Sequence, residues 1–139
     1  MTPLRRATLL SAEAGRVELQ LPQGWRARVM LLDGGGVGRF SLVPPQGWRE
    51  PRTWALDPEG CFPLEGKRRD SLFAADAKAA VTQEAARITL ANATLRARIA
   101  LEPFGIAWEQ CDAAGRWQAC CADRASYAYG TAERSGMLH

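Results

Sequence analysis

Histidine is almost absent from this 139-residue chain, because the only one is His139, the last residue of the sequence. Nucleophilic catalysis by serine or cysteine needs a base held beside the nucleophile, and histidine is the usual one. A residue at the end of a chain frays and is poorly positioned for this task. The sequence therefore excludes a catalytic triad built on histidine.

Cysteine is scarce, and no two cysteines have the Cys-x-x-Cys spacing of structural zinc sites. The four are Cys61, Cys111, Cys120 and Cys121. Cys120 and Cys121 are neighbours, and adjacent side chains of a regular strand point to opposite faces. We therefore expect reduced, partly buried thiols, and neither a metal site nor a cofactor.

Long apolar runs and concentrated charge are also missing. No run approaches the roughly 20 residues that span a bilayer, and the apolar residues 7–10 are too few for a secretory signal. The net charge of +3 is small, and acidic neighbours dilute the basic run 67–69. We expect a cytoplasmic protein with neither nucleic acid nor membrane as a partner.

The glycine-rich stretch 34–38 is the nearest match to a phosphate-binding loop. Arg39 stands where a dinucleotide fingerprint has its third glycine, and no Gly-Lys-Ser/Thr follows. A hairpin turn is the better interpretation. The 15 acidic residues could supply the two carboxylates of a glycosidase, but most lie in turns or beside arginines. We therefore assign no catalytic residue.

Alternation with a period of two is abundant, and this is the pattern of half-buried strands. It predicts a strand at 16–21 with Val17, Leu19 and Leu21 inward, and a second at 26–32 with Ala27, Val29 and Leu31 on one face. It also predicts a return strand at 37–43, with Phe40 and Leu42 inward and Ser41 outward. Between 87 and 117 it predicts consecutive antiparallel strands, with a tight turn at 112–115. One of these strands has Leu95, Ala97, Ile99 and Leu101 on one side and Arg96 and Arg98 on the other.

Three other segments are less regular. Residues 52–56 are the best strand candidate within a region rich in proline and glycine. Residues 71–86 have helix propensity but no apolar stripe, so a short helix and a strand at 79–83 paired with 87–90 both remain open, and the strand fits its extended surroundings better. The tail 131–139 shows neither a cap nor a closing strand.

A turn signal recurs about every ten residues between the alternating segments, which is typical of a sandwich or barrel. We predict one all-β domain over residues 1–139, an antiparallel β-sandwich. Its five tryptophans are many for this length. Trp108 and Trp117 are expected to pack within the sandwich, whereas Trp48 and Trp54, with Arg52 between them, could form a carbohydrate-binding platform in a loop.

Three segments taken in order resemble the start of bacterial family 31 glycoside hydrolases, the α-glucosidase and α-xylosidase family. They are residues 37–45, residues 51–56, and the alternating stretch that leads through Pro103-Phe104-Gly105-Ile106 to the turn at 112–115. The resemblance implies an N-terminal β-sandwich of the galactose-mutarotase-like kind (a supersandwich), followed in a longer chain by a catalytic (β/α)8 barrel. The barrel of that family carries both catalytic aspartates.

This resemblance makes the chain a non-catalytic domain of an enzyme that hydrolyses α-linked O-glycosyl bonds. Its partners would be the barrel, which this sequence lacks, and an α-linked oligosaccharide. Two alternatives stay open: a stand-alone carbohydrate-binding module that uses Trp48, Arg52 and Trp54, and a sandwich that binds another protein.

Overall fold

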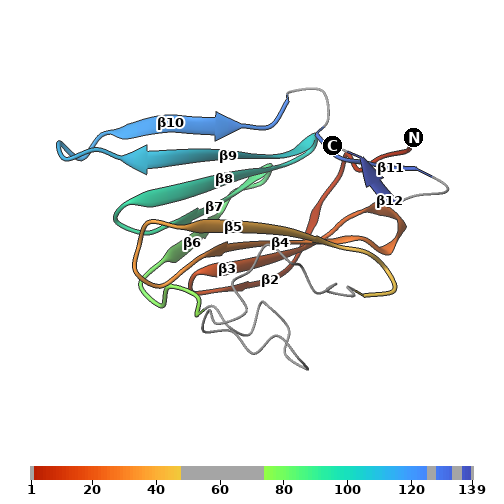
Figure 1. Ribbon diagram of the computed structural model, residues 1–139, viewed down its shortest axis with the longest axis horizontal. Helices are drawn as coiled ribbons and strands as arrows, with labels where there is room; N and C mark the ends of the chain where they lie inside the picture. The colour runs from red at the N-terminus through yellow and green to blue at the C-terminus, as the bar shows by residue number, and fades with distance from the viewer. Residues whose placement is uncertain (1, 48–73, 125–127, 133–135, 139) are drawn as a thin grey trace, which may run out of the picture.

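The protein is an antiparallel β-sandwich, as the alternating sequence predicts (Figure 1). The computed structural model describes residues 2–47, 74–124, 128–132 and 136–138. Within these ranges the chain forms strands and one 3-10 turn, η1 (Pro22–Gly24), and contains no α-helix. Nor do these residues include a helix long and apolar enough to cross a membrane.

One layer is a four-stranded sheet with the order β2-β3-β4-β5. Its strands are β2 (Thr8–Glu13), β3 (Arg16–Gln20), β4 (Arg26–Leu31) and β5 (Gly38–Val43). The expected inward residues of β3 and β4 are buried, because alternate side chains of a strand share one face. The glycine-rich stretch is the hairpin loop between β4 and β5, as predicted, with Gly34 and Gly35 at positive φ.

The other layer is a five-stranded sheet with the order β10-β9-β8-β7-β6. Its strands are β6 (Ala80–Gln83), β7 (Arg87–Ala91), β8 (Leu95–Leu101), β9 (Phe104–Cys111) and β10 (Trp117–Ala122). Each strand pairs with the next along the chain, so the layer is a meander. β6 confirms the strand prediction for this segment, and no helix occurs in its described part, 74–86.

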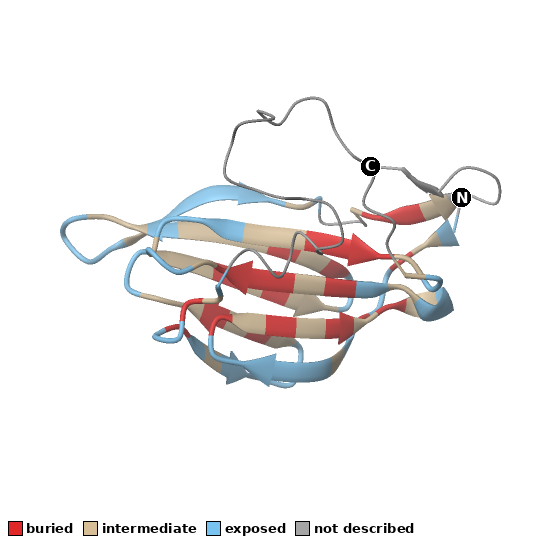
Figure 2. Ribbon diagram, turned by 60° about the horizontal axis from the view of Figure 1, so that its bottom comes forward, coloured by how far each residue is buried: buried red, intermediate tan, exposed pale blue. Residues whose placement is uncertain are grey.

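The core lies between the two layers and draws residues from both. Alternating buried positions run along the central strands, as Figure 2 shows in red. The fully buried aliphatic residues Leu19 and Val29 come from the four-stranded sheet, and Ile88 and Ile99 come from the five-stranded sheet. The two sheets therefore share one contiguous apolar core.

A third, small sheet lies at one end, with the order β1-β11-β12. It joins β1 (Thr2–Pro3) to β11 (Gly130–Ala132) and β12 (Gly136–Leu138). The tail therefore does contain strands, contrary to our expectation. The N–H of Leu4 donates to the carbonyl oxygen of Tyr129 at 3.0 Å, and both residues are buried.

Three outward positions of the four-stranded sheet are also buried, which the simple alternation did not predict. Met30, Ser41 and Val43 point away from the core, yet their exposed fractions are only 3%, 4% and 8%. The outer sides of the two sheets therefore differ, since every described strand residue on the outer side of the five-stranded sheet keeps partial or full exposure.

Candidate functional site

The residues that the sequence predicts as a sugar platform, Trp48, Arg52 and Trp54, lie outside the described residues. The same holds for Cys61, for the strand predicted at 52–56 and for the basic run 67–69. The loop that leads toward the platform is described as far as Gly47, whose N–H donates to the carbonyl oxygen of Pro44 at 2.9 Å. These site predictions remain predictions.

A different group of residues comes together on the side of the five-stranded sheet that faces away from the core, which we call the outer face. In β8, Arg96 and Arg98 alternate with the buried Ala97 and Ile99 and so point outward. The strand register then assigns their neighbours to the same face. These neighbours are Ala80, Thr82, Arg87, Thr89, Ala91, Ala100, Gly105, Ala107, Glu109, Cys111, Trp117, Ala119 and Ala122.

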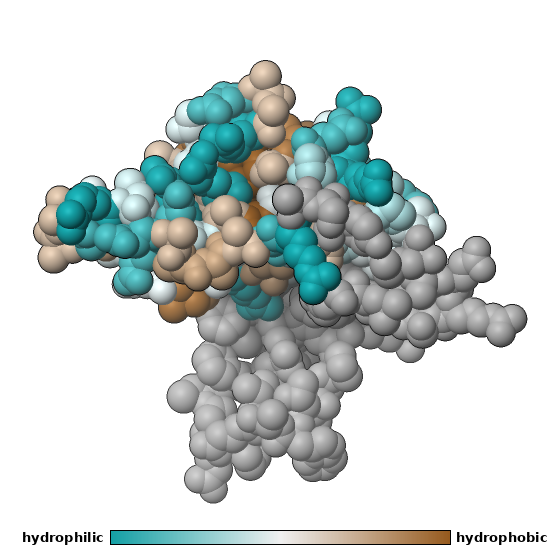
Figure 3. Space-filling model, turned by 90° about the horizontal axis from the view of Figure 1, so that it is seen from above, coloured by the Kyte–Doolittle hydropathy of each residue, from teal (hydrophilic) through white to brown (hydrophobic). Residues whose placement is uncertain are grey.

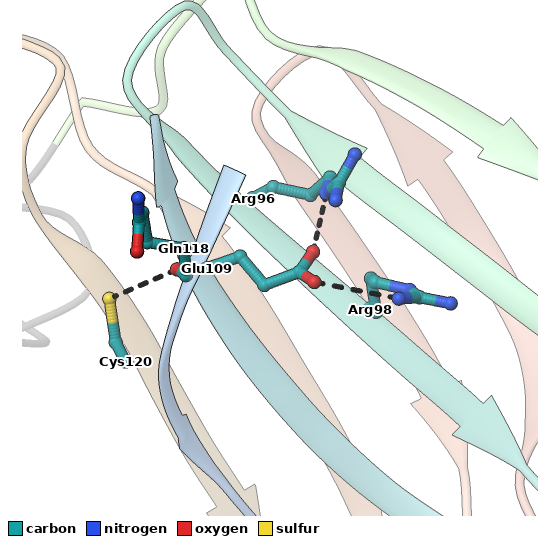
Figure 4. Close-up of polar contacts among 5 residues, drawn as sticks. All are labelled: Arg96, Arg98, Glu109, Gln118 and Cys120. Atoms are coloured by element: carbon teal, nitrogen blue, oxygen red, sulfur yellow. Dashed lines mark hydrogen bonds and ion pairs between the residues drawn. The ribbon is translucent and has the colours of Figure 1, made fainter. Parts of the chain in front are cut away.

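Glu109 is the only carboxylate among these outer-face strand residues and lies between two arginines. Its Oε2 accepts a hydrogen bond from Arg96 Nε at 2.5 Å, and its Oε1 is 3.5 Å from Arg98 Nη1 (Figure 4). The hydrogen bond from Arg96 lowers the pKa of Glu109 below its usual range and outweighs the opposing effect of burial. Glu109 is therefore held as a carboxylate at neutral pH.

Trp117 completes this group from the edge strand β10. The guanidinium carbon of Arg96 lies 4.4 Å from the centroid of the Trp117 ring, within the range of a cation–π contact. Trp117 was expected to pack in the core, but it lies on the outer face and stays partly exposed. Trp108 does pack against the core, as expected.

The other described carboxylates with shifted pKa values have structural partners. Arg16 and Arg28 both donate to Glu18, and their bonds and charges lower its pKa although burial acts in the opposite direction. The N–H of Lys78 and the amide of Asn92 hold Asp76 and lower its pKa. Asp112 caps the turn 112–115 by accepting from the N–H of Arg116, which also lowers its pKa.

A buried tyrosine joins the end of the sandwich to β9. The hydroxyl of Tyr129 donates to Asp123 Oδ2 at 2.9 Å, and the N–H of Ile106 donates to the same oxygen at 2.8 Å. Burial and the Asp123 carboxylate raise the pKa of Tyr129 well above its usual value. The tyrosine thus stays protonated and acts as a donor to a fixed carboxylate.

The described cysteines, Cys111, Cys120 and Cys121, are all free thiols, and Cys120 and Cys121 are exposed. The β9–β10 register shifts between Ala119 and Cys121, so a β-bulge interrupts the alternation that we assumed for this pair. The Sγ of Cys120 is 3.9 Å from the carbonyl oxygen of Gln118 (Figure 4). No cluster of three metal-ligating side chains occurs in the part of the chain that the structure describes.

No protein-family model, curated protein or solved structure matches this chain. Sequence reasoning missed the outer-face group, because arginines in an alternating strand usually belong to a solvated face. Two features of the sequence could have indicated this group. Both arginines of β8 fall on one face, and the next two strands contain Glu109 and Trp117.

Proposed function

We propose that this chain is the non-catalytic N-terminal β-sandwich of a family 31 α-glycosidase, with a galactose-mutarotase-like fold. In the intact cytoplasmic enzyme it would pack on the (β/α)8 barrel and help to shape the sugar-binding mouth. Two carboxylates of the barrel would hydrolyse the α-linked O-glycosyl bond by double displacement.

Two of the three segments that carry the resemblance lie within the described sheets. Residues 38–43 form β5, residues 104–106 open β9, and residues 112–115 form the β9–β10 turn. The other segment, residues 51–56, lies outside the described residues. The described segments belong to the framework of the two sheets, which supports a structural role for them.

One observation carries the non-catalytic part of the proposal: the described carboxylates that have shifted pKa values are shifted downward by hydrogen-bond donors. A glycosidase needs one carboxyl group whose pKa is raised, so that it can protonate the leaving oxygen. Glu18, Asp76, Glu109 and Asp112 are tuned in the opposite direction. They act as acceptors that hold strands and turns together.

The first experiment is an activity assay on the purified 139-residue chain. We expect no release of nitrophenol from 4-nitrophenyl α-glucoside or α-xyloside, with a full-length α-glucosidase as the positive control. Saturable turnover by the chain, lost when it is unfolded, would overturn the non-catalytic assignment.

The second experiment addresses the parent enzyme. We expect the gene to continue after His139 into a (β/α)8 barrel with two catalytic aspartates, and an extended protein to hydrolyse the same substrates. A stop codon directly after His139 would rule out the parent enzyme.

A further inference from the structure

The outer face of the five-stranded sheet carries more positive charge than its own residues neutralise. Its strands contribute Arg87, Arg96 and Arg98 but only one carboxylate, Glu109. Glu109 holds Arg96 closely, whereas its contact with Arg98 is at the limit of hydrogen bonding, at 3.5 Å. Among the described residues, Arg87 has no ion-pair partner and Arg98 has only this long contact with Glu109, so both keep N–H donors for an added anion.

The described carboxylates at the ends of the sheet form no ion pair with Arg87 or Arg98. Glu102, in the β8–β9 turn, pairs with Arg6 at 3.4 Å, and Asp112 pairs with Arg116 at 3.0 Å. Glu84, beside β7, uses its backbone N–H to bind the carbonyl oxygen of Arg87 and forms no described ion pair with that side chain. These described carboxylates therefore leave the excess positive charge on Arg87 and Arg98 in place.

The two arginines are close enough to act on one ligand. Arg98 lies opposite Thr89 in the β7–β8 pair, and Arg87 is two residues further along β7. Such diagonal neighbours in an antiparallel pair are about 7–8 Å apart, so two long side chains on them reach adjacent acidic groups. Arginine also binds a carboxylate through two parallel N–H groups, which gives this contact direction as well as strength.

The rest of the face suits contact with a protein. Arginine and tryptophan are enriched in protein interfaces and lysine is depleted, and the described outer-face strand residues include no lysine. Most of their neighbours are alanine or threonine, so an approaching chain meets little steric hindrance. Arg96 is already fixed between Glu109 and Trp117, which reduces the entropy that binding must remove. Viewed from the side of β10, hydrophilic and moderately hydrophobic residues are intermixed (Figure 3).

We propose that the outer face binds an acidic segment of a protein partner, with Arg87 and Arg98 pairing with its carboxylates and Trp117 contacting its aliphatic atoms. A nucleic acid fits less well, because sequence-independent binding to its phosphates needs a larger basic groove. The carboxylate of Glu109 would also repel the phosphates. The proposal is independent of the proposed function, since it concerns an acidic ligand and neither a barrel nor a sugar.

The test is an NMR titration of the isotope-labelled chain with a peptide of ten glutamates. We expect saturable shifts of the side-chain N–H signals of Arg87, Arg98 and Trp117. In the double variant Arg87→Gln/Arg98→Gln, we expect the dissociation constant to rise tenfold or more. The matched control is Arg116→Gln, which removes an exposed arginine in a turn and should leave the dissociation constant within twofold of the wild-type value.

Several results would overturn the proposal. They are the absence of saturable shifts, shifts of equal size at Arg26 and Arg116, or unchanged affinity in the double variant while its amide spectrum shows the native fold. Tighter binding of a ten-nucleotide single-stranded DNA than of the peptide would also overturn it, because the face would then recognise polyanions in general.

Discussion

Gly38 shows how closely single residues fit in the sandwich. It opens β5, and a Cβ built on it would lie 2.2 Å from Cζ3 of Trp108, which belongs to β9 in the other sheet. Two non-bonded carbon atoms cannot lie this close, so either the added Cβ or the Trp108 ring would have to shift. The glycine thus makes room for a large ring where the two layers meet.

We predict that Gly38→Ala lowers the free energy of unfolding by about 1–3 kcal/mol, the usual cost of overpacking. Gly36→Ala is the matched control, because its added Cβ would meet nothing within 4 Å. That variant should be as stable as the wild type or up to about 1 kcal/mol more stable. Urea titration checks both, and equal effects of the two substitutions would contradict the packing argument.

Tyr129 contributes at the same scale through its hydroxyl group. Its ring lies 5.2 Å from Phe40 and 5.5 Å from Phe104, between centroids, and phenylalanine would keep these contacts. Tyr129→Phe therefore removes mainly the hydrogen bond to Asp123. We expect it to cost about 1–3 kcal/mol at pH 8, as for hydrogen bonds to charged groups.

The pH dependence of this effect follows from the raised pKa of Tyr129. The unfolded chain loses the phenol proton first, near pH 10, so the stabilisation is complete below that pH and declines above it. The difference in unfolding free energy between wild type and Tyr129→Phe should be smaller at pH 10.5 than at pH 8. An equal difference at both pH values would show that the hydroxyl is not the cause.

Among the elements, the sequence predicts strands well where one side of the strand is buried and the other is polar. β3 and β8 follow this rule, and their alternating residues face the core as expected. In β4 the expected residues also face the core, although Met30 on the other side is buried as well. β2 was missed because it is an edge strand with mostly exposed residues, including Leu10 at 50% exposure, and so has no alternation to detect. β11 and β12 were missed because strands of three residues are too short for any periodicity.

The candidate site was harder to predict than the fold. Alternation assigns Arg96 and Arg98 to one face, but the Glu109 and Trp117 contacts depend on the register of three strands. Register is a property of strand pairing, and a single strand pattern does not contain it. The bulge between Ala119 and Cys121 adds a shift that no local signal reveals.

The Glu109 bridge across β8 and β9 should stabilise the sheet in a pH-dependent way. A carboxylate whose pKa is lowered in the folded state contributes stability above the unfolded pKa, near 4.5, and loses it as the pH falls through the folded value. We expect Glu109→Gln to cost about 0.5–1 kcal/mol at pH 7. The variant should then lose less stability than the wild type between pH 6 and pH 3.

Urea titrations at four pH values would measure this difference. Glu84→Gln is the control, because Glu84 is exposed and the described residues include no side-chain partner for it. It should follow the wild-type pH profile. If Glu109→Gln loses as much stability in acid as the wild type does, the arginine bridge does not contribute to the sheet.

At the scale of the whole molecule, the shared core decides how the protein unfolds. Val29 of β4 and Leu90 of β7 are fully buried and belong to the same cluster, although they lie in different sheets. Removing atoms from either side leaves a cavity that both sheets line. A core substitution in one sheet should therefore lower the stability of the other sheet as well.

We predict that Leu90→Ala lowers the free energy of unfolding by about 2–5 kcal/mol and Val29→Ala by about 1–3 kcal/mol. In both variants, far-UV circular dichroism and tryptophan fluorescence should report one coincident transition, as two-state unfolding requires. The control is Val37→Ala, which truncates a side chain exposed at 57% and should change stability by less than about 0.5 kcal/mol. Two separate transitions, or a substitution that shifts only one probe, would show that the sheets fold as independent units and that the core does not join them.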